Sequence, residues 1–144
     1  MTEREIRSFL KAGRGKYHLK EEIEREMRAI EEDVSAIGAI DYEKTKVSGG
    51  ELADLSDTVI KKELAMARLQ KKMALLQMDI FEWKEKALEM IACCADDIKR
   101  SILMERFISC DSWTTIQSRH NYAERNPYKL CNEAITEIVR KYGK

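Results

Sequence analysis

The sequence predicts an all-α protein in which an antiparallel helical hairpin or coiled coil is followed by a C-terminal helix-turn-helix. The chain has 144 residues, of which 36% are charged, and only one proline. Glu, Lys, Ala, Leu, Met and Arg are abundant, and these side chains lose little rotamer freedom in a helix. We expect a helical, oligomerising platform over residues 1–95 and the helix-turn-helix module over residues 96–144.

The first predicted helix is short and amphipathic. Ile6, Phe9 and Leu10 share one face of it. The Gly-Arg-Gly run at residues 13–15 is expected to end it in a turn, because glycine is the strongest local marker of turns. The same run lacks the full spacing of a phosphate-binding loop and follows no apolar strand, so we do not interpret it as one.

Two longer stretches carry apolar residues at alternating steps of three and four, the spacing of a coiled-coil seam. The first stretch is expected to end at Gly38, and residues 39–55 lose the pattern, as a surface loop would. Ser56 or Asp57 then offers an N-cap for a second helix that is much the longer of the two. The seam positions are Leu19, Ile23, Met27, Ile30, Val34 and Ile37 in the first stretch, and Val59, Met66, Leu69, Met73, Leu76, Ile80, Trp83, Ala87 and Met90 in the second.

The second long helix has more apolar surface than one partner helix would cover. Five apolar residues lie outside its seam, namely Leu75, Met78, Phe81, Leu88 and Ile91. We therefore expect a homodimer that forms through the helix at residues 57–92. The alternative is that Phe9, Leu10 and the C-terminal module cover this surface within one chain.

Several classes of function have no support in the composition. The four cysteines and two histidines lack the spacing of a zinc site, and no nucleophile lies beside a base, so we expect neither metal, cofactor nor catalysis. No N-terminal segment resembles a secretion signal, and no apolar run approaches the ~20 residues that span a bilayer. We therefore expect a cytoplasmic protein with reduced thiols and no membrane contact.

Three short helices are predicted in the C-terminal module. Asp96 and Asp97 close the long helix or cap the first of the three, and a break at residues 109–111 ends it. Ser112 is the expected N-cap of a short second helix, and a turn at residues 121–122 follows. One face of the last helix carries Tyr128, Leu130 or Cys131, Ala134, Ile135 and Ile138. Three short helices with a tight turn before the last one form the helix-turn-helix arrangement, whose last helix enters the major groove of DNA.

Pro127 determines where the last helix begins. Proline suits the first helical position and disfavours an α conformation in the residue before it. Asn126 is therefore the expected N-cap, and Arg125 would project from the turn ahead of the helix. Tyr128 and Lys129 would then lie in the first turn, near free backbone amides that can meet a phosphate.

Charge is distributed unevenly along a chain whose net charge is zero. Residues 98–144 contain nine basic and five acidic residues, a net charge of +4, and residues 1–97 carry −4. The electrostatic case for nucleic acid is therefore modest and confined to the C-terminal module. One copy alone should bind DNA weakly, so we expect binding to depend on dimerisation.

Residues 102–135 resemble region four of bacterial sigma factors. They are more similar still to the sigma-like C-terminal halves of phage late-gene transcription activators of the ArpU and RinA type. The residues that carry the resemblance are Arg106-Phe107, Ser112, Trp113, Ile116 and Ala134-Ile135. Gln117 and Pro127 depart from the pattern, which has a small residue and an aliphatic residue at these places. The resemblance implies a phage or prophage transcription regulator that binds double-stranded DNA and touches host RNA polymerase.

Six residues are the candidate DNA contacts: Arg125, Lys129, Tyr128, Asn126, Arg119 and Arg106. Arg125 and Lys129 rank first, because they flank the start of the helix whose first residues meet base edges. Arg106 and Arg119 are candidates for phosphate contact. Their alternative role is structural, as partners of the nearby acids Glu105, Asp111 and Glu133.

Two other functions stay open at this point. A phage terminase small subunit, which packages DNA, also joins a helix-turn-helix to an oligomerising helical region. A coiled-coil adaptor whose helix-turn-helix does not bind DNA is compatible with Pro127 and with the weak basic charge.

Overall fold

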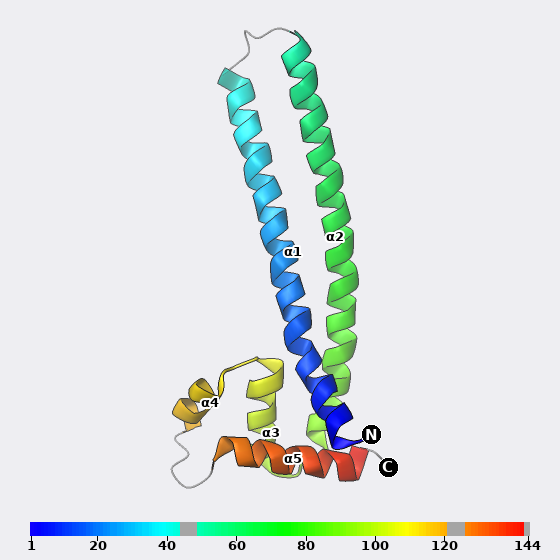
Figure 1. Ribbon diagram of the computed structural model, residues 1–144, viewed down its shortest axis with the longest axis vertical. Coiled ribbons are helices and arrows are strands. Elements are labelled where there is room, and N and C mark those ends of the chain that lie inside the picture. Colours follow the sequence, from blue (N-terminus) through cyan, green and yellow to red (C-terminus); the bar gives the residue numbers. More distant parts are fainter. Residues whose placement is uncertain (44–48, 121–125, 143–144) are drawn as a thin grey trace. The chain divides into compact units, whose positions relative to one another are not determined.

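The computed structural model describes the backbone of residues 1–43, 49–120 and 126–142, and the side chains of residues 1–33, 56–119 and 126–142. Its helices are α1 (Glu3–Glu43), α2 (Gly49–Ala92), α3 (Asp97–Leu103), the π-helical turn η1 (Met104–Ile108), α4 (Trp113–His120) and α5 (Pro127–Tyr142) (Figure 1). These described ranges contain no strand, which confirms the predicted all-α class. No helix within them is long and apolar enough to cross a membrane.

The chain divides into two compact units. The first consists of Met1–Tyr17 and Asp79–Lys144, and the second of His18–Met78. The first unit therefore combines the start of α1 and the end of α2 with α3, η1, α4 and α5. The domain boundary expected between residues 95 and 96 runs through this unit.

The start of α1 differs from the prediction, because α1 continues through Gly13 and Gly15 without a turn. A methyl group added at Gly13 would lie 2.2 Å from the Cη2 atom of Trp83. The indole Nε1 of Trp83 also donates to the carbonyl oxygen of Phe9 at 2.7 Å. Gly13 is therefore a site of close contact between α1 and α2, which explains a glycine inside a helix.

Both long helices extend further than predicted. α1 continues past Gly38 to Glu43, and α2 begins at Gly49, so Ser56 and Asp57 lie inside a helix instead of capping it. The two helices have 41 and 44 residues, so the expected difference in length is wrong. The apolar series of α2 continues back from Val59 to Leu55 and Leu52 in steps of four and three, but the loop-like composition of residues 39–55 concealed it.

In the second unit, the inner faces of α1 and α2 carry the predicted seam. Among the seam residues described there, Leu69 is buried and most others are half-buried, whereas Leu19 is 52% exposed. Ile30 and Met66 line one shared groove. Lys62, which interrupts the apolar series of α2, forms an ion pair with Asp33 of α1 at 3.1 Å.

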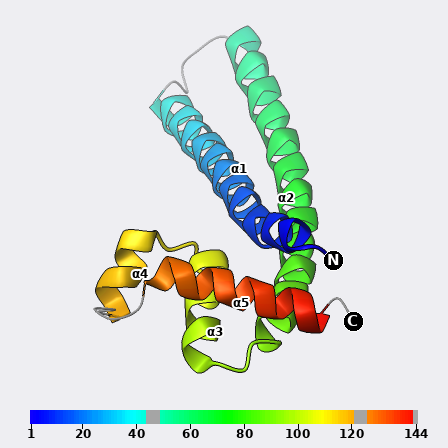
Figure 2. The same ribbon diagram turned by 60° about the horizontal axis from the view of Figure 1, so that its bottom comes forward.

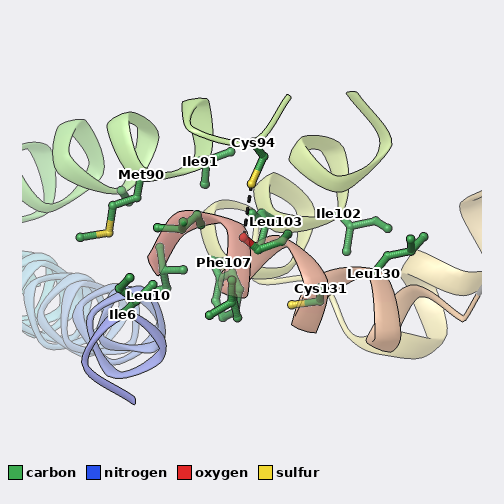
Figure 3. Close-up of a cluster of buried hydrophobic side chains, with 14 of the residues drawn as sticks. Ile6, Leu10, Met90, Ile91, Cys94, Ile102, Leu103, Phe107, Leu130 and Cys131 are labelled. Carbon is green, nitrogen blue, oxygen red and sulfur yellow. Dashed lines mark hydrogen bonds between the residues drawn. The ribbon is translucent and has the colours of Figure 1, made fainter. Parts of the chain in front are cut away.

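The first unit has one apolar core with buried residues from α1, α2, α3, η1 and α5, and Trp113 of α4 packs against it (Figure 3). Its largest fully buried members include Ile6, Leu10, Met90, Ile102, Leu103, Ile135 and Ile138. Leu130, Cys131 and Ala134 are also buried, which confirms the predicted inner face of α5. The exception is Tyr128, which is 54% exposed. The start of α1 is thus part of the same core as the C-terminal helices.

The helices α3 and α4 begin at the capping residues that the sequence predicted. Asp96 caps α3 by accepting from the amide of Ile98 at 2.9 Å, and Ser112 Oγ accepts from the amide of Thr115 at 3.2 Å in α4. Cys110 has a φ of 58° in the break between η1 and α4. Figure 2 shows α5 lying across α3, with α4 near the start of α5.

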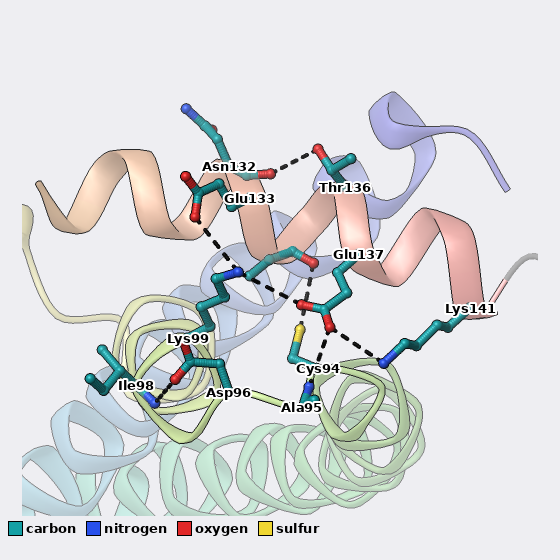
Figure 4. A network of polar contacts seen from close by, with 11 residues as sticks. Cys94, Ala95, Asp96, Ile98, Lys99, Asn132, Glu133, Thr136, Glu137 and Lys141 are labelled. Carbon is teal, nitrogen blue, oxygen red and sulfur yellow. Dashed lines mark hydrogen bonds and ion pairs between the residues drawn. The ribbon is translucent and has the colours of Figure 1, made fainter. Parts of the chain in front are cut away.

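A polar network joins Glu133 and Glu137 of α5 to the start of α3 (Figure 4). Lys99 lies 3.6 Å from a carboxylate oxygen of Glu133 and 3.9 Å from one of Glu137. Glu137 also accepts from the amide of Ala95 at 3.5 Å and pairs with Lys141 at 3.3 Å. Although burial alone would raise the pKa of Glu137, the amide of Ala95 and the two lysines together lower it.

Candidate nucleic-acid interface

The last helix begins as the sequence predicted. Pro127 is the first residue of α5, and Asn126 Oδ1 accepts from the amide of Tyr128 at 2.9 Å. The carbonyl oxygen of Asn126 accepts the first helical bond, from Leu130, at 3.1 Å. The prediction of Asn126 as N-cap is therefore confirmed. Arg125 lies outside the described residues.

The outer face of α5 is polar. Lys129, Thr136 and Arg140 are exposed and lie opposite the buried face of the helix. Within the described ranges, neither Lys129 nor Arg140 has an ion-pair partner. Both cations are therefore available to an external anion.

A cavity of about 290 Å³ lies between α1 and the C-terminal helices of the first unit. Its wall consists of Arg7, Leu10, Lys11, Arg14, Arg106, Phe107, Cys110, Trp113, Tyr128, Cys131 and Asn132. Four of these side chains are cationic, and none of these lining residues is acidic. The cavity is therefore a local concentration of positive charge in a chain that is neutral as a whole.

α1 supplies three of the four cations, because Arg7, Lys11 and Arg14 are spaced by four and three residues and so share one helical face. Arg7 is fixed in place: its Nη2 donates to Asn132 Oδ1 of α5 at 2.6 Å and to Glu3 Oε1 at 3.0 Å. Lys11 and Arg14 are exposed and have no hydrogen-bond or ion-pair partner among the described residues.

Arg106 is the fourth cation, and the structure orients it. Its Nη1 donates to the carbonyl oxygen of Asp111 at 3.0 Å, and its guanidinium lies 4.7 Å from the ring centroid of Trp113. The ring of Trp113 in turn lies 5.0 Å from that of Tyr128, at an interplanar angle of 56°. Neither contact neutralises the charge of Arg106, because a carbonyl and an aromatic face carry no net charge.

Arg119 behaves differently from the cations of the cavity. Its Nη1 lies 2.9 Å from Asp111 Oδ2 and 3.6 Å from Glu105 Oε1. The hydrogen bond to Asp111 is the main reason that the pKa of Arg119 is raised. The structural role that the sequence left open for Arg119 is therefore present, and its charge is offset by these two acids.

Two thiols line the cavity without adding negative charge. Burial raises the pKa of Cys110 and, more deeply in the core, that of Cys131, although nearby cations such as Arg106 oppose the shift. Both thiols are therefore neutral at pH 7. The cavity keeps the positive charge of Lys11, Arg14 and Arg106, whereas the charge of Arg7 is offset by Glu3 at 3.0 Å.

The sequence interpretation missed the contribution of α1 to this site. Arg7, Lys11 and Arg14 lie in residues 1–95, which the sequence predicts to be the oligomerising platform, so none of them is among the candidate DNA contacts. Their spacing of four and three was a visible signal. This spacing indicates a shared site only because α1 continues through Gly13 and packs beside the C-terminal helices of the first unit.

No group of three or more His, Cys, Asp or Glu side chains in the described part of the chain is placed to hold a metal ion. Comparisons of the chain with protein-family models, with curated protein sequences and with solved structures find no match.

Proposed function

We propose that this chain is a cytoplasmic phage or prophage transcription regulator. It binds double-stranded DNA as a homodimer, with α4 and α5 acting as a helix-turn-helix, and it touches host RNA polymerase. The observation that carries the proposal is the cavity beside the start of α5, with four cationic and no acidic side chains in its wall. Helix-turn-helix proteins need such cations, because contacts with phosphates set the register of the protein on the duplex.

The two sets of candidate residues have different tasks under this proposal. Lys11, Arg14 and Arg106 bind phosphates at the cavity. The outer face of α5, with Lys129 and Arg140, enters the major groove, where lysine and arginine donate to guanine. Arg119, already paired with Asp111, contributes less to binding than the cations of the cavity.

The salt dependence of DNA binding tests the role of the cavity. Each phosphate contact adds about 0.9 to the slope of log K against log salt concentration. The double variant Lys11→Ala/Arg14→Ala should therefore bind a duplex from the neighbouring genomic region more weakly, with a slope smaller by about 1.8. Arg25→Ala, which removes an exposed cation of the second unit, is the matched control and should leave the slope unchanged.

Other outcomes would point elsewhere. An unchanged slope in the double variant would remove the cavity from the interface. If the wild-type chain shows no salt-sensitive binding at low salt, the DNA proposal should be abandoned in favour of a coiled-coil adaptor. A ring of eight or more subunits in light scattering would favour a terminase small subunit, whereas a dimer favours the regulator.

A further inference from the structure

α2 carries a row of large apolar side chains that face solvent. Ile60 and Leu64 are 51% and 55% exposed, and Leu75, Met78 and Phe81 are each 62% exposed. Leu88 is 37% exposed, whereas Ile91 is buried. The sequence left open that one chain covers the five apolar residues outside the seam of α2. That alternative is wrong for four of them, and only Ile91 is buried.

Most of these side chains belong to a second heptad series on the continuous helix α2, in addition to the seam described above. Alternating steps of four and three connect Ile60, Leu64, Ala67, Lys71, Ala74, Met78, Phe81, Glu85 and Leu88, which we call the outer seam. All nine positions are exposed, and seven are apolar. Four heptads of such spacing are the pattern of a helix that pairs with another helix.

Charges beside the outer seam change sign along α2. One flank, at seven-residue spacing, carries Lys61, Arg68, Leu75, Glu82 and Glu89, and the other carries Glu63, Gln70, Gln77 and Lys84. All nine flanking residues are exposed. When the residues of one flank are paired with the same residues in reverse order, each basic residue meets an acidic one. The first flank is therefore complementary to itself in an antiparallel arrangement centred on residue 75, in which it lies beside the same flank of the partner.

We propose that a second copy of this chain covers the outer seam, with the two α2 helices antiparallel and centred near Leu75. Lys61 then faces Glu89 of the other copy, and Arg68 faces Glu82, because both pairs have their midpoint at residue 75. The two copies of Leu75 meet near the twofold axis, which accounts for the apolar residue in the middle of a charged flank.

The two charged members of the seam distinguish this arrangement from a parallel one. In a parallel, in-register pair, Lys71 would lie against Lys71 of the other copy, and Glu85 against Glu85, in the apolar layer. In the antiparallel pair the two Lys71 residues are about 12 Å apart along the axis, and the two Glu85 residues about 30 Å, at 1.5 Å per residue. Screening in physiological salt removes most of the repulsion at such separations.

A charge-reversal cycle followed by sedimentation equilibrium tests both the partner and the orientation. Arg68→Glu and Glu82→Arg should each weaken the dimer by about tenfold, since either change places like charges opposite each other at two symmetric sites. The double variant Arg68→Glu/Glu82→Arg should regain the wild-type dissociation constant. These residues are exposed, so each variant should keep the helicity of the wild type by circular dichroism.

Lys72→Glu is the matched control, because it reverses one exposed charge of α2 outside both seams and should leave the dissociation constant unchanged. A double variant as weak as the two single changes combined would overturn the antiparallel arrangement. A wild-type chain that sediments as a monomer would overturn the pairing itself. Neither result depends on DNA: loss of DNA binding with normal sedimentation would count against the proposed function alone.

Discussion

Gly13 and Gly15 are two glycines of one helix with opposite consequences. Replacement of glycine by alanine inside a helix stabilises it by roughly 1 kcal/mol when space is free. A Cβ at Gly15 meets nothing within 4 Å, whereas one at Gly13 would overlap the ring of Trp83. Gly13→Ala should therefore destabilise the protein by about 1–3 kcal/mol, as overpacked cores do.

Gly15→Ala is the matched control for this prediction and should raise the midpoint of denaturant unfolding. Equal shifts of the same sign for the two variants would contradict the close contact between Gly13 and Trp83. The residue type alone did not predict this difference, since its cause lies in Trp83, which is distant in sequence. A glycine pair typical of a turn therefore stands inside a helix.

Glu137 connects α5 to the start of α3 and makes stability depend on pH. Its pKa is lowered from the ordinary value of 4.5 by the amide of Ala95 and by Lys141 and Lys99, despite a burial effect that raises it. A lowered pKa in the folded state means that the carboxylate adds stability above about pH 4.5, and that this contribution is lost as the pH falls through the folded-state value.

Glu137→Gln should accordingly unfold at lower denaturant concentration than the wild type at pH 7. The difference should shrink as the pH falls below 4.5, because the wild-type side chain then becomes neutral as well. Denaturant midpoints of both proteins between pH 3 and pH 7 provide the measurement, over the range where each still folds. A difference that stays constant with pH would show that Glu137 acts through packing and not through charge.

At the scale of elements, helix starts in the C-terminal module were predictable and the ends of the long helices were not. Asp96, Ser112 and Asn126 act on amides two or three residues away, so the local sequence contains the whole cause. The end of α1 and the start of α2 fall within residues 39–55, where the Ser-Gly-Gly run and polar residues are typical of a loop although Leu52 and Leu55 continue the apolar spacing of α2. The cavity was not predictable, because it needs α1 and α5 together.

The cap of α5 carries a prediction of its own. Asn126→Ala removes the acceptor for the amide of Tyr128 and should cost about 1 kcal/mol, the typical effect of an N-cap. Asn126→Ser keeps an acceptor and should stay within a few tenths of a kcal/mol of the wild type. Chemical denaturation measures both. Equal losses in the two variants would mean that the amide side chain has some role other than capping.

At the scale of the whole molecule, the two proposals make a joint prediction, because the dimer joins two modules of modest charge. A second tethered module acts at an effective concentration in the millimolar range, which strengthens binding to a two-site duplex by about 10²–10⁴. At protein concentrations where Arg68→Glu is monomeric, this variant should lose most of that gain on a long duplex. The double variant Arg68→Glu/Glu82→Arg should recover it.

The loss cannot be a direct effect of charge on DNA attraction if Lys72→Glu, with the same charge change, still binds as the wild type does. Gel shifts with long and short duplexes measure the effect, since a duplex too short for two modules should bind the wild type and Arg68→Glu with similar affinity. If the long duplex shows no difference either, one module suffices for DNA binding, and the outer seam serves assembly without serving recognition.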